Sequence, residues 1–246
     1  MLDKTTYVLR VDGTPGWRNH TKAATLAMCP GNENWDGEKF RTVLEWATRH
    51  FDFIRIDLSD TLGRHNLMAL GTDDATALRQ SKNDGDLWIK ANGHTLLDCG
   101  KPFEIVRWDR WRLAPEYPTM HENINRVLFD DRMRAAVGRD IATYRARLLA
   151  RGQEPGPNFS VHALNYLKEE LACITLQASA LPGSSRLYPA AEPRSSVLLR
   201  SGIAPEITAL KREYYIAFNL RHRQPARDIA VRPTTKKHPS EPENRA

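Results

Sequence analysis

The sequence predicts an α/β fold with a Rossmann-like parallel sheet flanked by helices. Two short apolar runs, at 24–29 and 53–59, enclose a segment whose apolar residues recur at helical spacing, which is the pattern of a strand, a helix and a second strand. Strands joined in this way are almost always parallel. The length of 246 residues, with 41% hydrophobic and 27% charged residues, suits one large domain with a sizeable core.

The helix inside this unit is predicted from its apolar face, and Asp36 is a candidate to cap its first turn. Similar patterns predict the later elements. We expect a helical segment over 73–97 interrupted at Asp84-Gly85, a strand over 102–107, a basic-aromatic loop over 108–112, helical segments over 119–149 and 161–180, a strand over 184–189, a helix over 205–221 and a last strand over 228–232.

We assign residues 1–232 to a single domain. Residues 233–246 have no apolar side chain worth burying and are expected to form a disordered basic tail.

The composition argues against several classes of protein. No segment resembles a secretion signal, and none approaches the roughly 18 apolar residues of a membrane span, so we expect a cytoplasmic protein without membrane contact. Cys29, Cys99 and Cys173 are too few for a disulfide framework and are expected to be free thiols. Because no phosphate-binding glycine motif and no closely spaced set of metal ligands occurs, we expect no cofactor and no metal.

The net charge of +6 and the sequence pI of about 9.3 suit a polyanionic partner. They fit a basic, solvated surface equally well.

Cys29 ends the apolar run A-T-L-A-M-C and is followed by the turn Pro30-Gly31-Asn32. In open parallel sheets, ligands bind beyond the carboxyl ends of the strands, and the N-terminus of the following helix would favour a thiolate there. Free cysteine is also among the most buried residue types. Taken alone, the stretch favours a packed thiol over a nucleophile and leaves both open.

A second candidate site lies on the helix predicted over 161–180. Leu164, Leu167, Leu171 and Ile174 form its buried stripe, and Tyr166-Glu170-Cys173 form a neighbouring one. A phenol and a carboxylate four residues apart project together and can hold an ammonium group. The alternative is a half-buried tyrosine beside a solvated glutamate.

Together these segments resemble the tRNA-dependent cyclodipeptide synthases. That family has an apolar strand ending in serine, a P/A-G-N turn, a helix ending in L-x-W-A-x-x-F, a strand and then D-T-L-x-R-H-N. The chain reads A-T-L-A-M-C-P-G-N, V-L-E-W-A-T-R-H-F and I-D-L-S-D-T-L-G-R-H-N, and 165–170 match a later N-Y-x-x-x-E signature. The resemblance is clear over 24–70 and 160–190 and faint elsewhere.

The resemblance implies a fold like the catalytic domain of class I tyrosyl- and tryptophanyl-tRNA synthetases. It also implies an aminoacyltransferase that takes two aminoacyl-tRNAs and uses no ATP. One aminoacyl group moves to the strand-end nucleophile, a second aminoacyl-tRNA yields a dipeptidyl-enzyme, and attack of the free amine releases a 2,5-diketopiperazine, a secondary metabolite.

Carried over by position, the resemblance also implies roles for single residues. Cys29 occupies the position of the family's serine nucleophile, and Tyr166 and Glu170 occupy those of the pair that holds the substrate's amino group. Tyr188 corresponds to a tyrosine that assists catalysis. Gly31 and Asn32 correspond to residues of the turn that contacts the substrate. The match at Tyr188 is the least specific, because 195–200 competes for the same strand. Cysteine is compatible with acyl transfer, since a thiolate is a good nucleophile and a thioester reacts readily with amines.

Asp57 is the second departure from the family pattern. By ungapped alignment it falls on the strand that walls the first aminoacyl pocket, where family members that use hydrophobic amino acids have an apolar residue. An unpaired buried aspartate is costly. Either it makes a local hydrogen bond or pairs with Arg55 or Arg64, or it receives a cationic substrate side chain, best an arginine. The second interpretation resembles the fungal arginine-containing branch of the family, and it makes Arg-tRNA and a second aminoacyl-tRNA the expected partners.

The tRNA surface is less well marked. Many family members have a dense basic helix after the second strand, but the corresponding segment here has only Arg79, Lys82 and Lys90 among four aspartates. The basic-aromatic segment with Arg107, Arg110 and Arg112, or the basic C-terminal segments, are further candidates.

Two rival functions stay open. One is a cysteine-dependent amidohydrolase or acyltransferase, which needs a histidine base near Cys29, for which His65 and His162 are the distant candidates. The other is a synthetase-like tRNA-binding module without activity. We expect a monomer or a homodimer.

Overall fold

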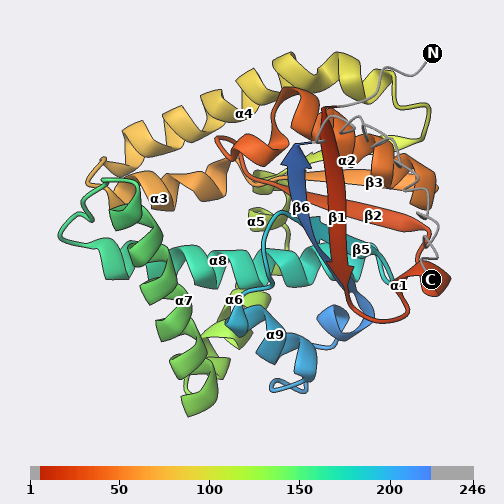
Figure 1. Ribbon diagram of the computed structural model, residues 1–246. Coiled ribbons are helices and arrows are strands. Elements are labelled where there is room, and N and C mark those ends of the chain that lie inside the picture. The colour runs from red at the N-terminus through yellow and green to blue at the C-terminus, as the bar shows by residue number, and fades with distance from the viewer. Residues whose placement is uncertain (1–5, 223–246) are drawn as a thin grey trace, which may run out of the picture.

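The computed structural model describes residues 6–222. Within them the strands are β1 (Tyr7–Gly13), β2 (Ala23–Met28), β3 (Phe53–Leu58), β4 (Phe103–Arg107), β5 (Ser185–Tyr188) and β6 (Tyr214–His222). They form one sheet in the order β1-β6-β5-β2-β3-β4 (Figure 1). Strands β6, β5, β2, β3 and β4 run parallel to one another, and β1 pairs antiparallel with β6 at the edge. The predicted Rossmann-like parallel sheet is confirmed, with an antiparallel edge strand added.

The helices lie on both faces of this sheet (Figure 1). They are α1 (Trp17–His20), α2 (Gly37–His50), α3 (Arg64–Ala69), α4 (Asp74–Leu97), α5 (Trp108–Arg112), α6 (Tyr117–Val127), α7 (Asp131–Ala150), α8 (Phe159–Ala180) and α9 (Arg194–Ser201). In the part of the chain that the structure describes, none of them has both the length and the hydropathy of a membrane span.

The two faces of the sheet differ in chemistry. Toward α2 and α4 the sheet is apolar, with Leu26, Ile54 and Ile56 fully buried against Phe40 and Trp88. Because side chains alternate along a strand, the residues between them point to the opposite face, which α8 crosses (Figure 1). That face carries buried polar and charged side chains, namely Thr25, Arg55, Asp57 and Arg186. A charged layer under α8 is suited to bind a polar substrate.

Two segments near the ends of the described chain differ from the prediction. The helix expected over 205–221 is wrong: a short 3-10 turn at Ala209–Arg212 leads into strand β6. The apolar residues of 214–220 fit either period, and pairing with β5 and β1 decides for the strand. Strand β1 was not predicted, since its only partner lies some 200 residues away in the sequence. The strand expected over 228–232 and the tail at 233–246 lie outside the described residues.

Two further segments also differ. The basic-aromatic loop expected over 108–112 is the short helix α5, because Trp108 and Trp111 are buried one turn apart. The helical segment over 119–149 is divided into α6 and α7, because the carboxylate of Asp130 accepts hydrogen bonds from the amides of Arg132 and Met133 and starts a new helix. At α2, Asp36 occupies the N-cap position without making a capping hydrogen bond.

Helix α4 runs without interruption through Asp84-Gly85, contrary to the prediction. A Cβ atom at Gly85 would lie 2.8 Å from the Cβ and Oδ2 atoms of Asp60 and 3.1 Å from the guanidinium of Arg107. Gly85 therefore allows α4 to pack closely against Asp60 and Arg107, and it does not interrupt the helix.

Candidate active site

Cys29 lies directly beyond the carboxyl end of β2, on the face of the sheet that α8 covers. Ser59 follows β3 in the same position, and the amide of Ser59 donates to the carbonyl of Met28 at 2.7 Å. Tyr188 ends the neighbouring strand β5, and Tyr166 projects from α8. The hydroxyls of Tyr188, Ser59 and Tyr166 hydrogen-bond to the sulfur of Cys29. Four separate elements thus converge on one thiol.

The turn after Cys29 has the geometry that its sequence requires. Gly31 has a φ of 79°, in the left-handed region that favours glycine. The amide of Asn32 donates to the carbonyl of Cys29 at 3.2 Å, and the side-chain Oδ1 of Asn32 accepts from the amide of Asn34 at 3.1 Å. The turn is closed on itself and fixes the direction in which the chain leaves the sulfur.

The thiol of Cys29 is held in its neutral form. Burial and, to a smaller extent, the charge of Glu170 raise its pKa to about 11, against the hydrogen bonds from Tyr188, Ser59 and Tyr166. This shift is opposite to the one that a helix N-terminus close to the sulfur would cause, because burial and a neighbouring carboxylate both disfavour the thiolate. A cation that neutralises Glu170 would make the sulfur easier to ionise.

Tyr166 and Glu170 project together from α8, as their spacing predicts. The phenol of Tyr166 donates to Oε1 of Glu170 at 3.5 Å. Burial raises the pKa of Glu170 to about 7, opposed by the charge of Arg186 and the hydrogen bond from Tyr166. Burial and the charge of Glu170 raise the pKa of Tyr166. The pair is therefore a neutral phenol beside a carboxylate whose charge lacks full compensation.

A pocket of about 150 Å³ opens beside Cys29. Its other lining residues include Ser59, Asp60, Asn66, Ser81, Asp84 and Tyr166. Asp57 does not line this pocket. The lining next to the thiol combines apolar groups, such as Pro30 and Leu67, with polar ones that include the carboxylates of Asp60 and Asp84.

Asp57 lies in the charged layer under α8, with 1% of its surface exposed. Its Oδ1 accepts from the indole of Trp111 at 3.3 Å, and its Oδ2 has no hydrogen-bond partner. The ion pairs considered from the sequence do not form, since Arg55 binds Glu104 and Arg64 binds Glu169. The hydrogen bond from Trp111 is a local hydrogen bond of the kind also considered. Burial raises the pKa of Asp57 to about 7, against the charges of Arg186 and Arg55.

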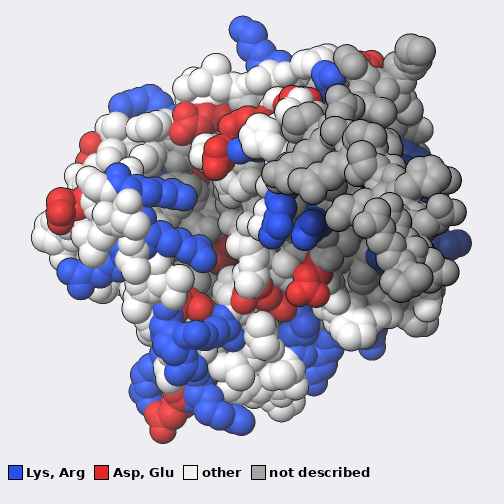
Figure 2. Space-filling view, viewed as in Figure 1, with Lys and Arg blue, Asp and Glu red and all other residues white. Residues whose placement is uncertain are grey.

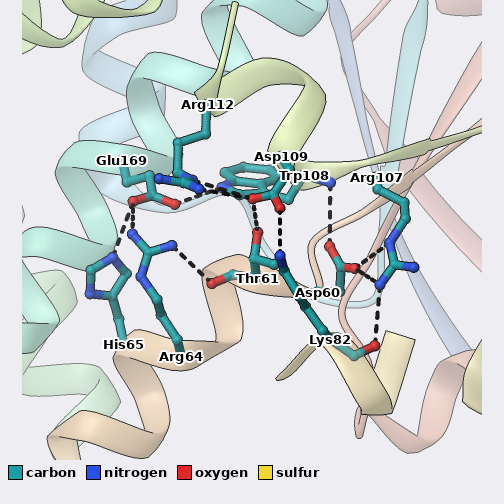
Figure 3. Close-up of polar contacts among 10 residues, drawn as sticks. All are labelled: Asp60, Thr61, Arg64, His65, Lys82, Arg107, Trp108, Asp109, Arg112 and Glu169. Carbon is teal, nitrogen blue, oxygen red and sulfur yellow. Dashed lines mark hydrogen bonds and ion pairs between the residues drawn. The ribbon is translucent and has the colours of Figure 1, made fainter. Parts of the chain in front are cut away.

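A network that the sequence did not reveal connects α8 to the D-T-L-G-R-H-N segment (Figure 3). Glu169, next to Glu170, accepts from Arg64 at 2.6 Å and from the indole of Trp108 at 2.9 Å, and lies 3.2 Å from Nε2 of His65. The motif itself was the available signal, since Arg64 and His65 belong to it. These contacts fix the position of α8, and with it the direction of Glu170.

In the same network, half of the basic side chains predicted to contact tRNA form ion pairs with aspartates (Figure 3). Arg107 pairs with Asp60 and Asp86, and both Lys82 and Arg112 pair with Asp109. Their charges are compensated inside the protein. The other three candidates are exposed: Arg79 and Lys90 on α4, and Arg110 on α5.

Neither of the histidines considered for a hydrolase, His65 and His162, lines the pocket beside Cys29 or is among the groups that shift the pKa of its thiol. His65 is buried against Glu169, and the hydrogen bonds to Cys29 come from hydroxyl groups. Within residues 6–222, no group of three or more His, Cys, Asp or Glu side chains is arranged to hold a metal ion.

Comparisons with known proteins agree with this geometry. The chain has no significant match among curated proteins. Similar solved structures include a cyclodipeptide synthase from Fluoribacter dumoffii (20% identity, TM-score 0.76, 87% of this chain and 100% of that one). Another, from Mycobacterium tuberculosis, is described as showing that these enzymes are related to type I tRNA synthetases (19% identity, TM-score 0.67, 87% and 94%). A third, from Candidatus Glomeribacter gigasporarum, is bound to Phe-tRNAPhe (15% identity, TM-score 0.66, 91% and 95%).

At these identities the likeness shows a shared fold. The family itself is shown by the sequence, because residues 18–201, most of the chain, match the family model described as cyclodipeptide synthase. A strand-end cysteine facing a tyrosine and a glutamate on the covering helix, in a fold shared with solved cyclodipeptide synthases, agrees with that match, and the chain belongs to the cyclodipeptide synthase family.

Proposed function

We propose that this chain makes a 2,5-diketopiperazine from two aminoacyl-tRNAs through an aminoacyl-enzyme on Cys29. The observation that carries the proposal is the convergence of Tyr166, Tyr188 and Glu170 on the thiol at the carboxyl end of the sheet. The similar structure bound to Phe-tRNAPhe supports aminoacyl-tRNA as the partner. Because charged tRNA is a cytoplasmic substrate, we expect the protein to act there.

In the first step, the ammonium group of the aminoacyl ester binds between the phenol of Tyr166 and the carboxylate of Glu170. It neutralises the charge that raises the pKa of Cys29. The sulfur attacks the ester carbonyl, the S–C bond forms, the C–O bond to the ribose breaks, and the thiol proton ends on the ribose hydroxyl. Tyr188, hydrogen-bonded to the sulfur, is placed to assist this proton transfer.

In the second step, the ammonium of the enzyme-bound aminoacyl group gives a proton to Glu170, and the resulting amine attacks the ester of a second aminoacyl-tRNA. An amide bond forms, the second tRNA leaves with a free hydroxyl, and a dipeptidyl thioester remains on Cys29. The terminal amine of this dipeptide then attacks the thioester, closes the six-membered ring and returns the thiol.

We further propose that the first amino acid is arginine and that Asp57 binds its guanidinium. Asp57 offers a buried carboxylate oxygen without a hydrogen-bond partner, and burial destabilises its charge. The charge of Arg186 lowers the pKa of both Asp57 and Glu170, so both acids are within electrostatic reach of one guanidinium. Since Asp57 does not line the pocket at Cys29, binding requires the pocket to extend toward β3.

The covalent step is tested by incubating the protein with charged tRNA and measuring its intact mass. We expect an aminoacyl adduct on Cys29, loss of adduct and product in Cys29→Ala, and both retained in the control Cys99→Ala, whose thiol donates to the carbonyl of Lys101 away from the site. Product formation by Cys29→Ala would contradict the mechanism. An adduct also distinguishes the enzyme from an inactive tRNA-binding module.

The arginine assignment is tested by offering Arg-tRNA and a hydrophobic aminoacyl-tRNA in competition. We expect Asp57→Asn and Asp57→Leu to lower the arginine content of the product at least tenfold, because the guanidinium loses its charged partner. The control is Asp52→Asn, an exposed aspartate just before the same strand. Unchanged arginine incorporation in Asp57→Leu would show that another group selects the side chain.

A further inference from the structure

Helix α7 carries an excess of positive charge that the catalytic steps do not use. It has five arginines and two aspartates, and Arg151 follows its last residue. Helix α4, on which the sequence placed three tRNA-contact candidates, has one arginine, two lysines and three aspartates. Figure 2 shows Lys and Arg side chains gathered over α7. Among the described residues, a basic surface therefore lies on α7, a helix on which the sequence placed no tRNA-contact candidate.

The charge on α7 is only partly compensated. Near its start, Arg132 pairs with Asp130 and Arg134 with Asp131. The remaining arginines are exposed and make no ion pair with a described residue; they are Arg139, Arg145, Arg147 and Arg151. Uncompensated, exposed guanidinium groups suit phosphate.

Two of these arginines are on the side of α7 that borders the active site. Asp140, Tyr144, Arg147 and Arg151 follow one another at spacings of four, three and four residues, which places them on one side of the helix. The charge of Asp140 is a minor cause of the raised pKa of Glu170, and the charge of Tyr144 is a minor cause of the raised pKa of Tyr166; burial is the largest cause in both cases.

Arg151 also faces the nucleophile turn. The pKa of Glu33, which follows Asn32, is lowered mainly by Lys39 and further by the charge of Arg151. This side of α7 thus extends from the substrate-binding pair on α8 to the turn after Cys29.

We propose that Arg147 and Arg151 bind backbone phosphates of the aminoacyl-tRNA close to its charged 3′ end. Four residues of helix rise about 6 Å, comparable to the separation of successive phosphates along an RNA strand. The inference rests on the proposed function, since the tRNA must bring its ester to Cys29. It adds that the electrostatic contact of this chain is made by α7, where the charges are free, and that α4 contributes less.

The test measures the affinity of the full chain for charged tRNA and for uncharged tRNA, as a function of salt. We expect Arg147→Glu/Arg151→Glu to weaken binding of both at least tenfold. In the neutral variant Arg147→Gln/Arg151→Gln, the slope of log affinity against log salt should become shallower by roughly 1.5 to 2, because two phosphates are no longer neutralised by the protein.

The matched control is Arg41→Glu/Arg49→Glu, which changes the net charge by the same amount on α2, across the sheet from α8. We expect its affinity to stay within about twofold of the wild type. Wild-type binding by the α7 variants, or a larger loss in Arg79→Glu/Lys90→Glu on α4, would overturn the inference and leave the proposed function standing. Failure of the wild type to bind tRNA and to make diketopiperazine would instead overturn the proposed function.

Discussion

At the scale of single residues, the site combines a neutral thiol with an acid whose charge is poorly compensated. The pKa of Cys29 is raised to about 11 and that of Glu170 to about 7, in both cases chiefly by burial. The two pKa shifts are coupled, because the charge of Glu170 contributes to the raised pKa of the thiol. A substrate ammonium would relieve both, so binding the correct group also activates the nucleophile.

This coupling predicts a pH dependence. Below about pH 7, Glu170 takes up a proton and loses its attraction for the ammonium group. We expect the KM for aminoacyl-tRNA to rise about tenfold per pH unit as the pH falls from 7 to 5.5. In Glu170→Gln the KM should be high and independent of pH over this range. A wild-type KM that stays flat across this range would show that the carboxylate does not hold the substrate.

At the scale of elements, the position of the catalytic pair depends on contacts between helices. Glu169 joins α8 to α3 and α5, and Asp60 joins the segment after β3 to Arg107 at the end of β4. Helix α4 closes over this second contact at Gly85, where a Cβ atom would lie 2.8 Å from Asp60. The close approach of α4 to Asp60 therefore depends on the absence of a side chain at Gly85.

Two glycines of α4 provide a matched comparison. Gly93→Ala adds a Cβ into open space and should stabilise the protein by about 0.5 to 1 kcal/mol, the usual gain in a helix. Gly85→Ala meets Asp60 and Arg107 and should instead destabilise it by about 1 to 3 kcal/mol. Chemical denaturation measures both. If the two variants change stability by the same amount, α4 does not pack against Asp60 as described.

At the scale of the whole molecule, the charged layer under α8 stabilises the fold less than an apolar layer would. Asp57 is nearly unexposed and its pKa is raised to about 7 by burial, so between about pH 4 and pH 7 the folded chain keeps a proton that the unfolded chain has lost. By linkage, its contribution to stability falls as the pH rises through this window and is constant above it. If Asp57 binds the substrate as proposed, its charge is retained at a cost in stability.

We therefore expect Asp57→Asn to be more stable than the wild type, increasingly so as the pH rises. The difference in unfolding free energy should grow between pH 5 and pH 8 by on the order of 2 to 4 kcal/mol. Thermal unfolding of both proteins across this range measures it. A constant difference in Tm would mean that the carboxylate is already compensated in the folded protein.

The sequence by itself determined the strand-helix-strand unit and, through its motifs, the family. Both depend on local spacing: apolar runs of five to seven residues, and a tyrosine and a glutamate one helical turn apart. Spacing singled out Cys29 and the pair Tyr166 and Glu170, and the resemblance to the family added Tyr188 to them.

Only the tertiary structure decided which groups meet. The strand at 214–222 is a strand because β1 pairs with it from the far end of the chain, and no local pattern encodes that partner. The thiol is neutral because its surroundings are buried and acidic, although a helix N-terminus follows it in the sequence. Lys82 and Arg107 are compensated by aspartates from other elements, while Arg139, Arg145 and Arg147 on α7 make no ion pair with a described residue. Pairing, burial and charge compensation are relations between residues distant in sequence, so they exist only once the chain has folded.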